Sequence, residues 1–168
     1  LRIAGTGPQR DALQRLAKND PRITLLGQLT DEDLAEEYRS ALAVPFVPED
    51  EDLGLITLEA QRCATPVVTC TDSGGVTEFV EDGVNGFVAA PTAAAIGGAL
   101  QRLASDMSLA AEMGRRGQEG AQTITWDTTI GALLDDTESS DDDARRPRVA
   151  ALCTYPAFPA HHGGQIRI

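Results

Sequence analysis

Residues 49–80 read EDEDLGLITLEAQRCATPVVTCTDSGGVTEFV, and this stretch decides the fold. An acidic loop leads to Gly54, and the apolar spacing of residues 54–64 predicts a buried helix. Residues 65–70, TPVVTC, form a short apolar run typical of a buried strand. The Gly74-Gly75 pair then predicts a turn, followed by a short helix in VTEFV. A helix that leads straight into a buried strand is typical of α/β proteins.

The same alternation continues on both sides of this stretch. We expect further strands in LRIAG at residues 1–5, RITLLG at 22–27 and AVPFVP at 43–48. Helices are expected between them at 8–20 and 30–42, the second one capped by Thr30. After a turn-rich segment and a last short strand come two or three amphipathic helices up to residue 136. The second has Leu109 and Met113 on its apolar side, and the last is docked by Trp126. Strands alternating with helices predict an α/β fold, a Rossmann-like parallel sheet with helices on both faces.

Composition limits the classes of protein to consider. With 168 residues and 42% hydrophobic content, the chain suits one ordinary domain with appendages. A formal net charge of −12 would repel nucleic acid and anionic membranes, so neither is expected as a partner. Three cysteines without CxxC spacing suit reduced thiols and a cytoplasmic location. No apolar run approaches the length of about eighteen residues that a transmembrane helix needs.

Two places could bind an anion at the carboxyl end of a strand. GTGP, residues 5–8, begins like a dinucleotide fingerprint, but Arg10 stands where the third glycine belongs, which leaves a plain strand-to-helix turn as the simpler interpretation. The second place is Gly54, where the absence of a Cβ would let helix amides approach a diphosphate. Spacing alone does not decide the role of Glu51 and Glu59, because acidic residues near a helix N-terminus also complement the helix dipole.

The residues in order resemble a known family. EDEDLGLITLEAQRCATPVVTCTDSGGVTEFVEDGVNGFVAAP, with ITWD at 124–127, is similar to the nucleotide-sugar half of retaining GT-B glycosyltransferases of glycosyltransferase family four (group 1 type). The family's two glutamates, with seven residues between them, stand here as Glu51 and Glu59. The resemblance runs in order through residues 1–134, which would form the nucleotide-sugar-binding domain.

This resemblance implies roles for individual residues. Glu59 would accept hydrogen bonds from the ribose hydroxyls of a nucleotide. Glu51 would orient the transferred sugar and balance the charge that develops as its bond to phosphate breaks. Backbone amides of Gly54, Leu55 and Ile56 would bind the departing phosphate. The family needs no cofactor, and no metal site is expected; the partners would be a nucleotide-diphosphate sugar and a glycan or lipid-linked acceptor.

Departures from the family pattern concern both the loop and the chain as a whole. Asp52 and Leu53 replace a common glycine and an aromatic residue, which adds negative charge near a diphosphate. The family's Arg and Lys, which neutralise the diphosphate, would lie before Leu1, and the acceptor-binding domain before them. We therefore expect a C-terminal half of a GT-B fold, truncated at its N-terminus and inactive alone.

The C-terminal residues do not fit this domain. An acidic linker is expected at 135–146, and an apolar run followed by HHGGQIRI at 147–168. This segment resembles the first strand and glycine-rich loop of a second GT-B N-terminal domain, with Gly163 and Gly164 beside the sugar phosphate. An unstructured tail and a metal site at His161 and His162 are the alternatives.

Two other functions stay open at this stage. The first is a non-catalytic, Rossmann-like nucleotide-binding or interaction module that kept the fold and lost transfer. The second is a nicotinamide-binding oxidoreductase domain, which Arg10 in the glycine fingerprint disfavours.

Overall fold

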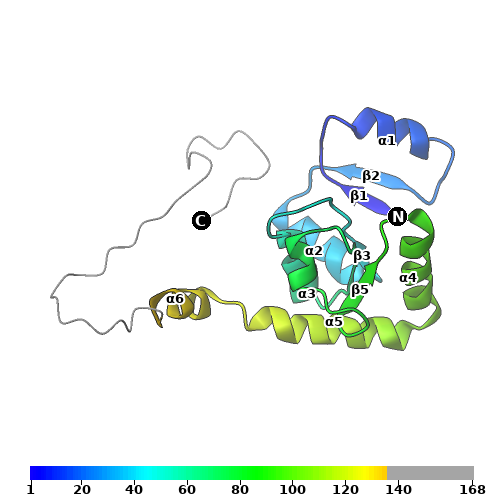
Figure 1. Ribbon diagram of the computed structural model, residues 1–168. Coiled ribbons are helices and arrows are strands. Elements are labelled where there is room, and N and C mark those ends of the chain that lie inside the picture. Colours follow the sequence, from blue (N-terminus) through cyan, green and yellow to red (C-terminus); the bar gives the residue numbers. More distant parts are fainter. Residues whose placement is uncertain (136–168) are drawn as a thin grey trace, which may run out of the picture. The chain divides into compact units, whose positions relative to one another are not determined.

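The computed structural model describes residues 1–135, and their side chains as far as residue 132 (Figure 1). The elements in order are β1 Arg2–Ala4, α1 Arg10–Ala17, β2 Thr24–Gly27, α2 Asp31–Ser40, β3 Val44–Pro45, α3 Leu55–Arg62, β4 Val67–Cys70, the 3-10 helix η1 Gly75–Glu78, β5 Gly86–Ala89, α4 Ala93–Ser105, α5 Met107–Gln122 and α6 Trp126–Asp135. Strands and helices alternate and each strand pairing is parallel, which confirms the α/β class. All but the first residue of the predicted linker, and the predicted second unit with Gly163 and Gly164, lie outside the described residues.

A three-stranded sheet in the order β3-β4-β5 forms the centre of the compact unit Leu1–Ala132. Strand β4 is buried along its whole length, and its successive residues Val67 and Val68 belong to different core clusters. Val67 packs with Tyr38 of α2 and Ala60 of α3, whereas Val68 packs with residues of α4 and α5. Because successive side chains in a strand point to opposite faces, helices cover both faces of this sheet, as expected.

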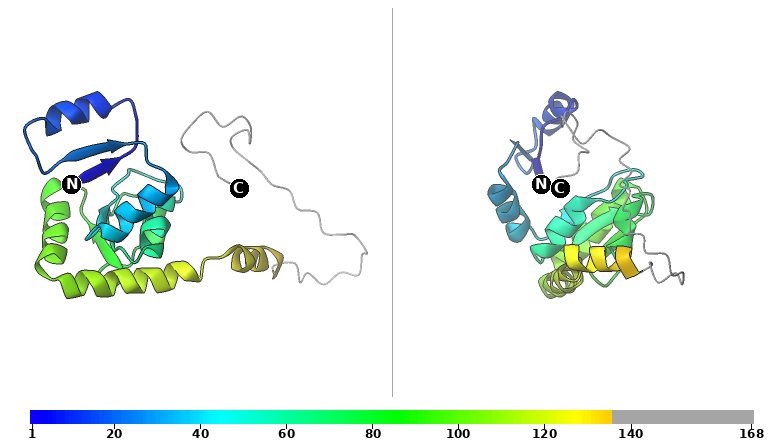
Figure 2. Two further views of the ribbon diagram at one scale, coloured as in Figure 1. Left: turned by 180° about the vertical axis from the view of Figure 1, so that it is seen from behind. Right: turned by 90° about the vertical axis from the view of Figure 1, so that its left-hand side faces the viewer.

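Strands β1 and β2 form a second, separate sheet of their own. Figures 1 and 2 show this pair and α1 together at one end of the unit. One continuous parallel sheet was expected; instead, among the described strands, β1 pairs only with β2 and β3 only with β4. LRIAG was also expected to be a buried strand, but Arg2 and Ala4 are exposed and Ile3 is half-buried, because β1 has a neighbour on one edge only.

The ends of the helices follow ordinary capping chemistry. In α2 the Thr30 hydroxyl accepts a hydrogen bond from the Asp33 amide at 3.1 Å, which confirms the predicted cap. Helix α3 buries one face through Thr57, Ala60 and Gln61, whereas Leu55 and Ile56 are exposed, so the expectation of a buried helix holds for that one face only. Trp126 was expected to dock the last helix, but its side chain is 69% exposed and Ile130, about one turn further on, is exposed as well.

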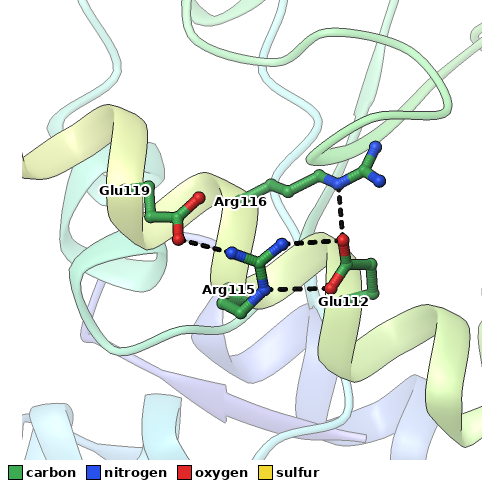
Figure 3. Close-up of polar contacts among 4 residues, drawn as sticks. All are labelled: Glu112, Arg115, Arg116 and Glu119. Atoms are coloured by element: carbon green, nitrogen blue, oxygen red, sulfur yellow. Dashed lines mark hydrogen bonds and ion pairs between the residues drawn. The ribbon is translucent and has the colours of Figure 1, made fainter.

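Helix α5 is fixed by close backbone packing on its inner side and carries charge on its outer side. A Cβ at Gly114 would lie 2.0 Å from the carbonyl oxygen of Ala64, so the helix approaches the end of α3 directly. On the exposed surface, Glu112 accepts from Arg115 and Arg116, both at 2.8 Å, and Arg115 also pairs with Glu119 (Figure 3). Such exposed pairs contribute little to stability.

Candidate functional site

The loop between β3 and α3 is held in place by backbone hydrogen bonds to the loop after β4. The Asp50 amide donates to the Asp72 carbonyl at 2.9 Å, and the Gly75 amide donates to the Glu51 carbonyl at 2.7 Å. Glu51 and Gly74 form an isolated parallel bridge. The backbone position of Glu51 is therefore set by main-chain contacts, independently of its carboxylate.

Ser73 adds a side-chain contact to the same pair of loops. Its hydroxyl donates to the Pro48 carbonyl at 2.9 Å and accepts from the Cys70 amide at 3.2 Å. Ser73 is fully buried, so its hydroxyl has both a donor and an acceptor partner in a place where water cannot supply them. The TDSGG segment thus serves as the support of the acidic loop.

Gly74 and Gly75 are required by how closely the two loops approach. A Cβ at Gly74 would lie 2.5 Å from the carbonyl oxygen of Glu51, and one at Gly75 would lie 2.2 Å from that of Asp52. Gly74 also has a φ of 62°, a conformation that residues with side chains rarely adopt. A side chain at either position would push the acidic loop away.

Gly54 caps helix α3 and opens its N-terminus. It is buried with φ 72° and ψ 54°, and a Cβ there would lie 2.5 Å from Cγ2 of Val76. The first helical bond runs from the Thr57 amide to the Gly54 carbonyl at 2.9 Å, so the amides of Leu55 and Ile56 precede the helix ladder. These amides and the helix dipole suit an anion.

Glu59 lies one turn further along α3, on the same face as exposed Leu55. Its Oε2 accepts a hydrogen bond from the Tyr38 hydroxyl at 3.2 Å. Burial, followed by the neighbouring Glu59 carboxylate, raises the pKa of the Tyr38 phenol well above its ordinary value of 10. The phenol therefore stays protonated and donates. The structure thus brings together a helix end with free amides, a glutamate before it and another one turn after it.

Tyr38 is the site residue that sequence reasoning missed. The sequence places it on the apolar face of α2, where the ring packs, and nothing in its spacing indicates that the hydroxyl reaches Glu59. One general feature could have pointed to it, because a buried tyrosine hydroxyl needs a hydrogen-bond partner.

The loop GTGP belongs to a different place. Residues Gly5 to Arg10 line a cavity together with Ile3, Leu13 and Leu25, and none of the residues from Glu51 to Glu59 lines it. Arg10 reaches the end of β2, since a Cβ at Gly27 would lie 3.3 Å from its Nη1. The structure thus keeps this loop as the turn between β1 and α1.

Residues 1–135 contain no group of three or more His, Cys, Asp or Glu side chains arranged to hold a metal ion. No helix in the same residues is long and apolar enough to cross a membrane.

Comparison with known proteins supplies the family. The model of the family "Glycosyl transferases group 1" matches residues 1–120. D-inositol 3-phosphate glycosyltransferase of Mycolicibacterium smegmatis is 36% identical over 171 residues, covering 95% of this chain and 38% of the relative. The enzyme of the same name from Salinispora tropica is 37% identical over 115 residues, covering 68% of this chain and 24% of the relative. The chain therefore spans well under half the length of these relatives.

Solved structures show the same fold. Sucrose-phosphate synthase from Thermosynechococcus elongatus superposes with a TM-score of 0.70 at 28% identity, covering 81% of this chain and 38% of that one. HepE of Anabaena, solved in complex with UDP-glucose, superposes with a TM-score of 0.69 at 24% identity, covering 81% and 39%. With a family model matched over most of its length and relatives above a third identical, this chain belongs to the glycosyl transferases group 1 family.

Proposed function

We propose that this chain forms the donor-binding half of a glycosyltransferase, which transfers a sugar from a nucleoside diphosphate sugar to an acceptor with retention of configuration. The observation that carries the proposal is the N-terminus of α3, where Gly54 leaves the Leu55 and Ile56 amides outside the helix ladder between two glutamates. Family membership supports it, as do structural neighbours solved with UDP and with UDP-glucose.

Each part of the donor has its own binding residues in this proposal. The amides at the start of α3 bind the phosphate of the leaving nucleotide, and Glu59 accepts hydrogen bonds from the ribose hydroxyls. Glu51 lies beside the sugar. Glu51 then stabilises the positive charge that develops at the sugar as its bond to phosphate breaks. Glu59 lies four residues after the exposed Leu55, so the carboxylate proposed to bind the ribose is on the exposed face of the helix.

Charge indicates what else the reaction needs. Residues 40–61 hold five carboxylates and no Lys or Arg, so this segment cannot by itself neutralise a diphosphate. The cations are expected from a segment that precedes these residues in the complete enzyme, together with the domain that binds a glycan or lipid-linked acceptor. We propose no metal or cofactor for the reaction. A cytoplasmic location is proposed as well, and the free thiols of Cys63 and Cys70 support it.

The test compares three alanine variants of the complete enzyme. Glu59→Ala should weaken nucleoside diphosphate binding by about 1.5–3 kcal/mol, the scale of a hydrogen bond to a charged group. Glu51→Ala should lower kcat more than affinity. Glu49→Ala removes an exposed carboxylate from the same loop and serves as the matched control. Calorimetric titration and donor kinetics measure both quantities, and equal affinity for the wild type and Glu59→Ala would exclude the ribose assignment.

The isolated 168-residue chain gives a second readout. It should transfer no sugar, because without a facing domain the donor stays in water and the acceptor is not positioned. Turnover by this chain alone would contradict the proposal. Nucleotide binding without turnover by the complete protein would instead favour a non-catalytic module.

A further inference from the structure

Tyr38 is fixed in the last turn of α2 by contacts that have nothing to do with its hydroxyl. Its side chain is only 8% exposed and packs in one cluster with Ala60, Val67 and Val76. Its carbonyl oxygen accepts from the Thr65 hydroxyl at 2.6 Å. Ring and backbone are therefore both held, and the hydroxyl is a donor at a fixed point.

Glu59 has the opposite character. It is exposed, and a free glutamate side chain on a helix surface samples several rotamers. The Tyr38 hydroxyl donates to its Oε2 at 3.2 Å, which couples the mobile carboxylate to the fixed ring. An ionised carboxylate offers about four acceptor positions, so this bond leaves capacity for two neighbouring hydroxyls of a ligand.

We propose that Tyr38 is a positioning residue. It holds the Glu59 carboxylate in the orientation in which that carboxylate accepts hydrogen bonds from the ribose hydroxyls of the donor. The inference rests on the proposed function, since it assigns a task to the partner of Glu59. Tyr38 itself touches no donor atom in this proposal. Its contribution is preorganisation, because a carboxylate already held in place loses less rotamer freedom when the nucleotide binds. The raised pKa of the phenol agrees with this role, because the hydroxyl keeps its proton throughout the working pH range.

The experiment uses the complete enzyme, titrated with UDP and with GDP, and the one that binds the wild type is carried through. Tyr38→Phe keeps the buried ring and removes only the donor. We expect Kd for the nucleoside diphosphate and KM for its sugar to rise about three- to tenfold, with kcat and the unfolding midpoint unchanged. Ser40→Ala is the matched control: it removes a side-chain hydrogen bond from the same turn of α2, to the Glu37 carbonyl at 3.2 Å, and should leave Kd unchanged.

A double-mutant comparison separates positioning from general packing. In a Glu59→Ala background, Tyr38→Phe should cause little further loss of affinity, because the carboxylate that Tyr38 holds is already gone. Full additivity, or wild-type affinity in Tyr38→Phe, would overturn the inference while Glu59→Ala still weakens binding and the proposed function stands. If Glu59→Ala also binds like the wild type, the ribose assignment itself fails and the role of Tyr38 fails with it.

Discussion

The N-terminal segment Leu1–Gly27 and the three-stranded core around β4 are built from the same pattern of strand, helix and parallel strand, yet they differ in how well they are buried. Every buried hydrophobic residue in the described part of the chain lies at or after Tyr38. In the N-terminal segment, by contrast, Leu16 is 82% exposed, and Leu13 lines a cavity together with Ile3 and Leu25 instead of closing on them.

The difference shows what an amphipathic pattern can and cannot predict. Periodicity identifies the face of α1 that would be buried, and α1 does form where it was expected. Burial also requires a partner on that face. Strand β4 packs against a core cluster on each of its faces, whereas neither cluster contains a residue of α1 or β1. Stability should therefore be concentrated in the core, with little contributed by the first 27 residues.

The largest expected effect compares one leucine from each region. Leu103 in α4 is fully buried, so Leu103→Ala should lower the free energy of unfolding by about 3–4 kcal/mol through lost transfer energy and a cavity. Leu16→Ala should change it by no more than about 0.5 kcal/mol, because the side chain is already in water. Urea unfolding measures both. A comparable loss in the two variants would mean that α1 is buried in solution.

A smaller effect is expected from a methyl group added to α5. Gly114→Ala places a Cβ 2.0 Å from the Ala64 carbonyl oxygen, which should lower the free energy of unfolding by about 2 kcal/mol. Gly120→Ala, in the same helix but with open space around it, should raise it by up to about 1 kcal/mol through helix propensity. Thermal unfolding distinguishes the pair, and the same sign in both variants would show that α5 does not approach Ala64 so closely.

The smallest effect compares two partly exposed carboxylates, one from each region. Side-chain hydrogen bonds from Arg22 lower the pKa of Asp20 to about 2, and those from Arg115 and Arg116 lower that of Glu112 to about 2. Both pKa values are depressed on folding. Each pair therefore stabilises the fold above the ordinary pKa near 4, and that contribution is lost as the pH falls toward 2.

Carboxyl-carbon NMR titration measures the two groups separately, with Asp20→Asn and Glu112→Gln to assign the resonances. We expect both to titrate near pH 2. If Asp20 titrates near its ordinary value while Glu112 does not, the Asp20–Arg22 pair is not formed in solution, and the contrast between the regions is larger than the structure shows.

Much of the fold could be predicted because local patterns determine it. The apolar run of β4, the Thr30 cap of α2 and the apolar side of α5 with Met113 all appear where the sequence placed them. The separation into two sheets could not be predicted, because it depends on which strand edges find partners. The exposure of Trp126 could not be predicted either, since a large aromatic residue favours burial only where a surface exists to receive it.

For the candidate site, the segment could be chosen from the sequence, but the contacts that support it could not. Glu51, Gly54 and Glu59 were identified by their order and by resemblance. The need for Gly74 and Gly75 was attributed to a turn, whereas it arises from the approach of a loop more than twenty residues earlier. The partnership of Tyr38 and Glu59 joins residues 21 positions apart on different helices, and no local pattern encodes it.

The main-chain anchoring of the acidic loop has a consequence for how such a site changes over evolution. Because the backbone of Glu51 is held through its carbonyl by Gly75 and through its bridge to Gly74, the identity of its side chain is uncoupled from the shape of the loop. A substitution at position 51 can therefore change the chemistry that the loop presents while its main-chain frame is kept. Such a loop can be altered one side chain at a time, without an intermediate that fails to fold.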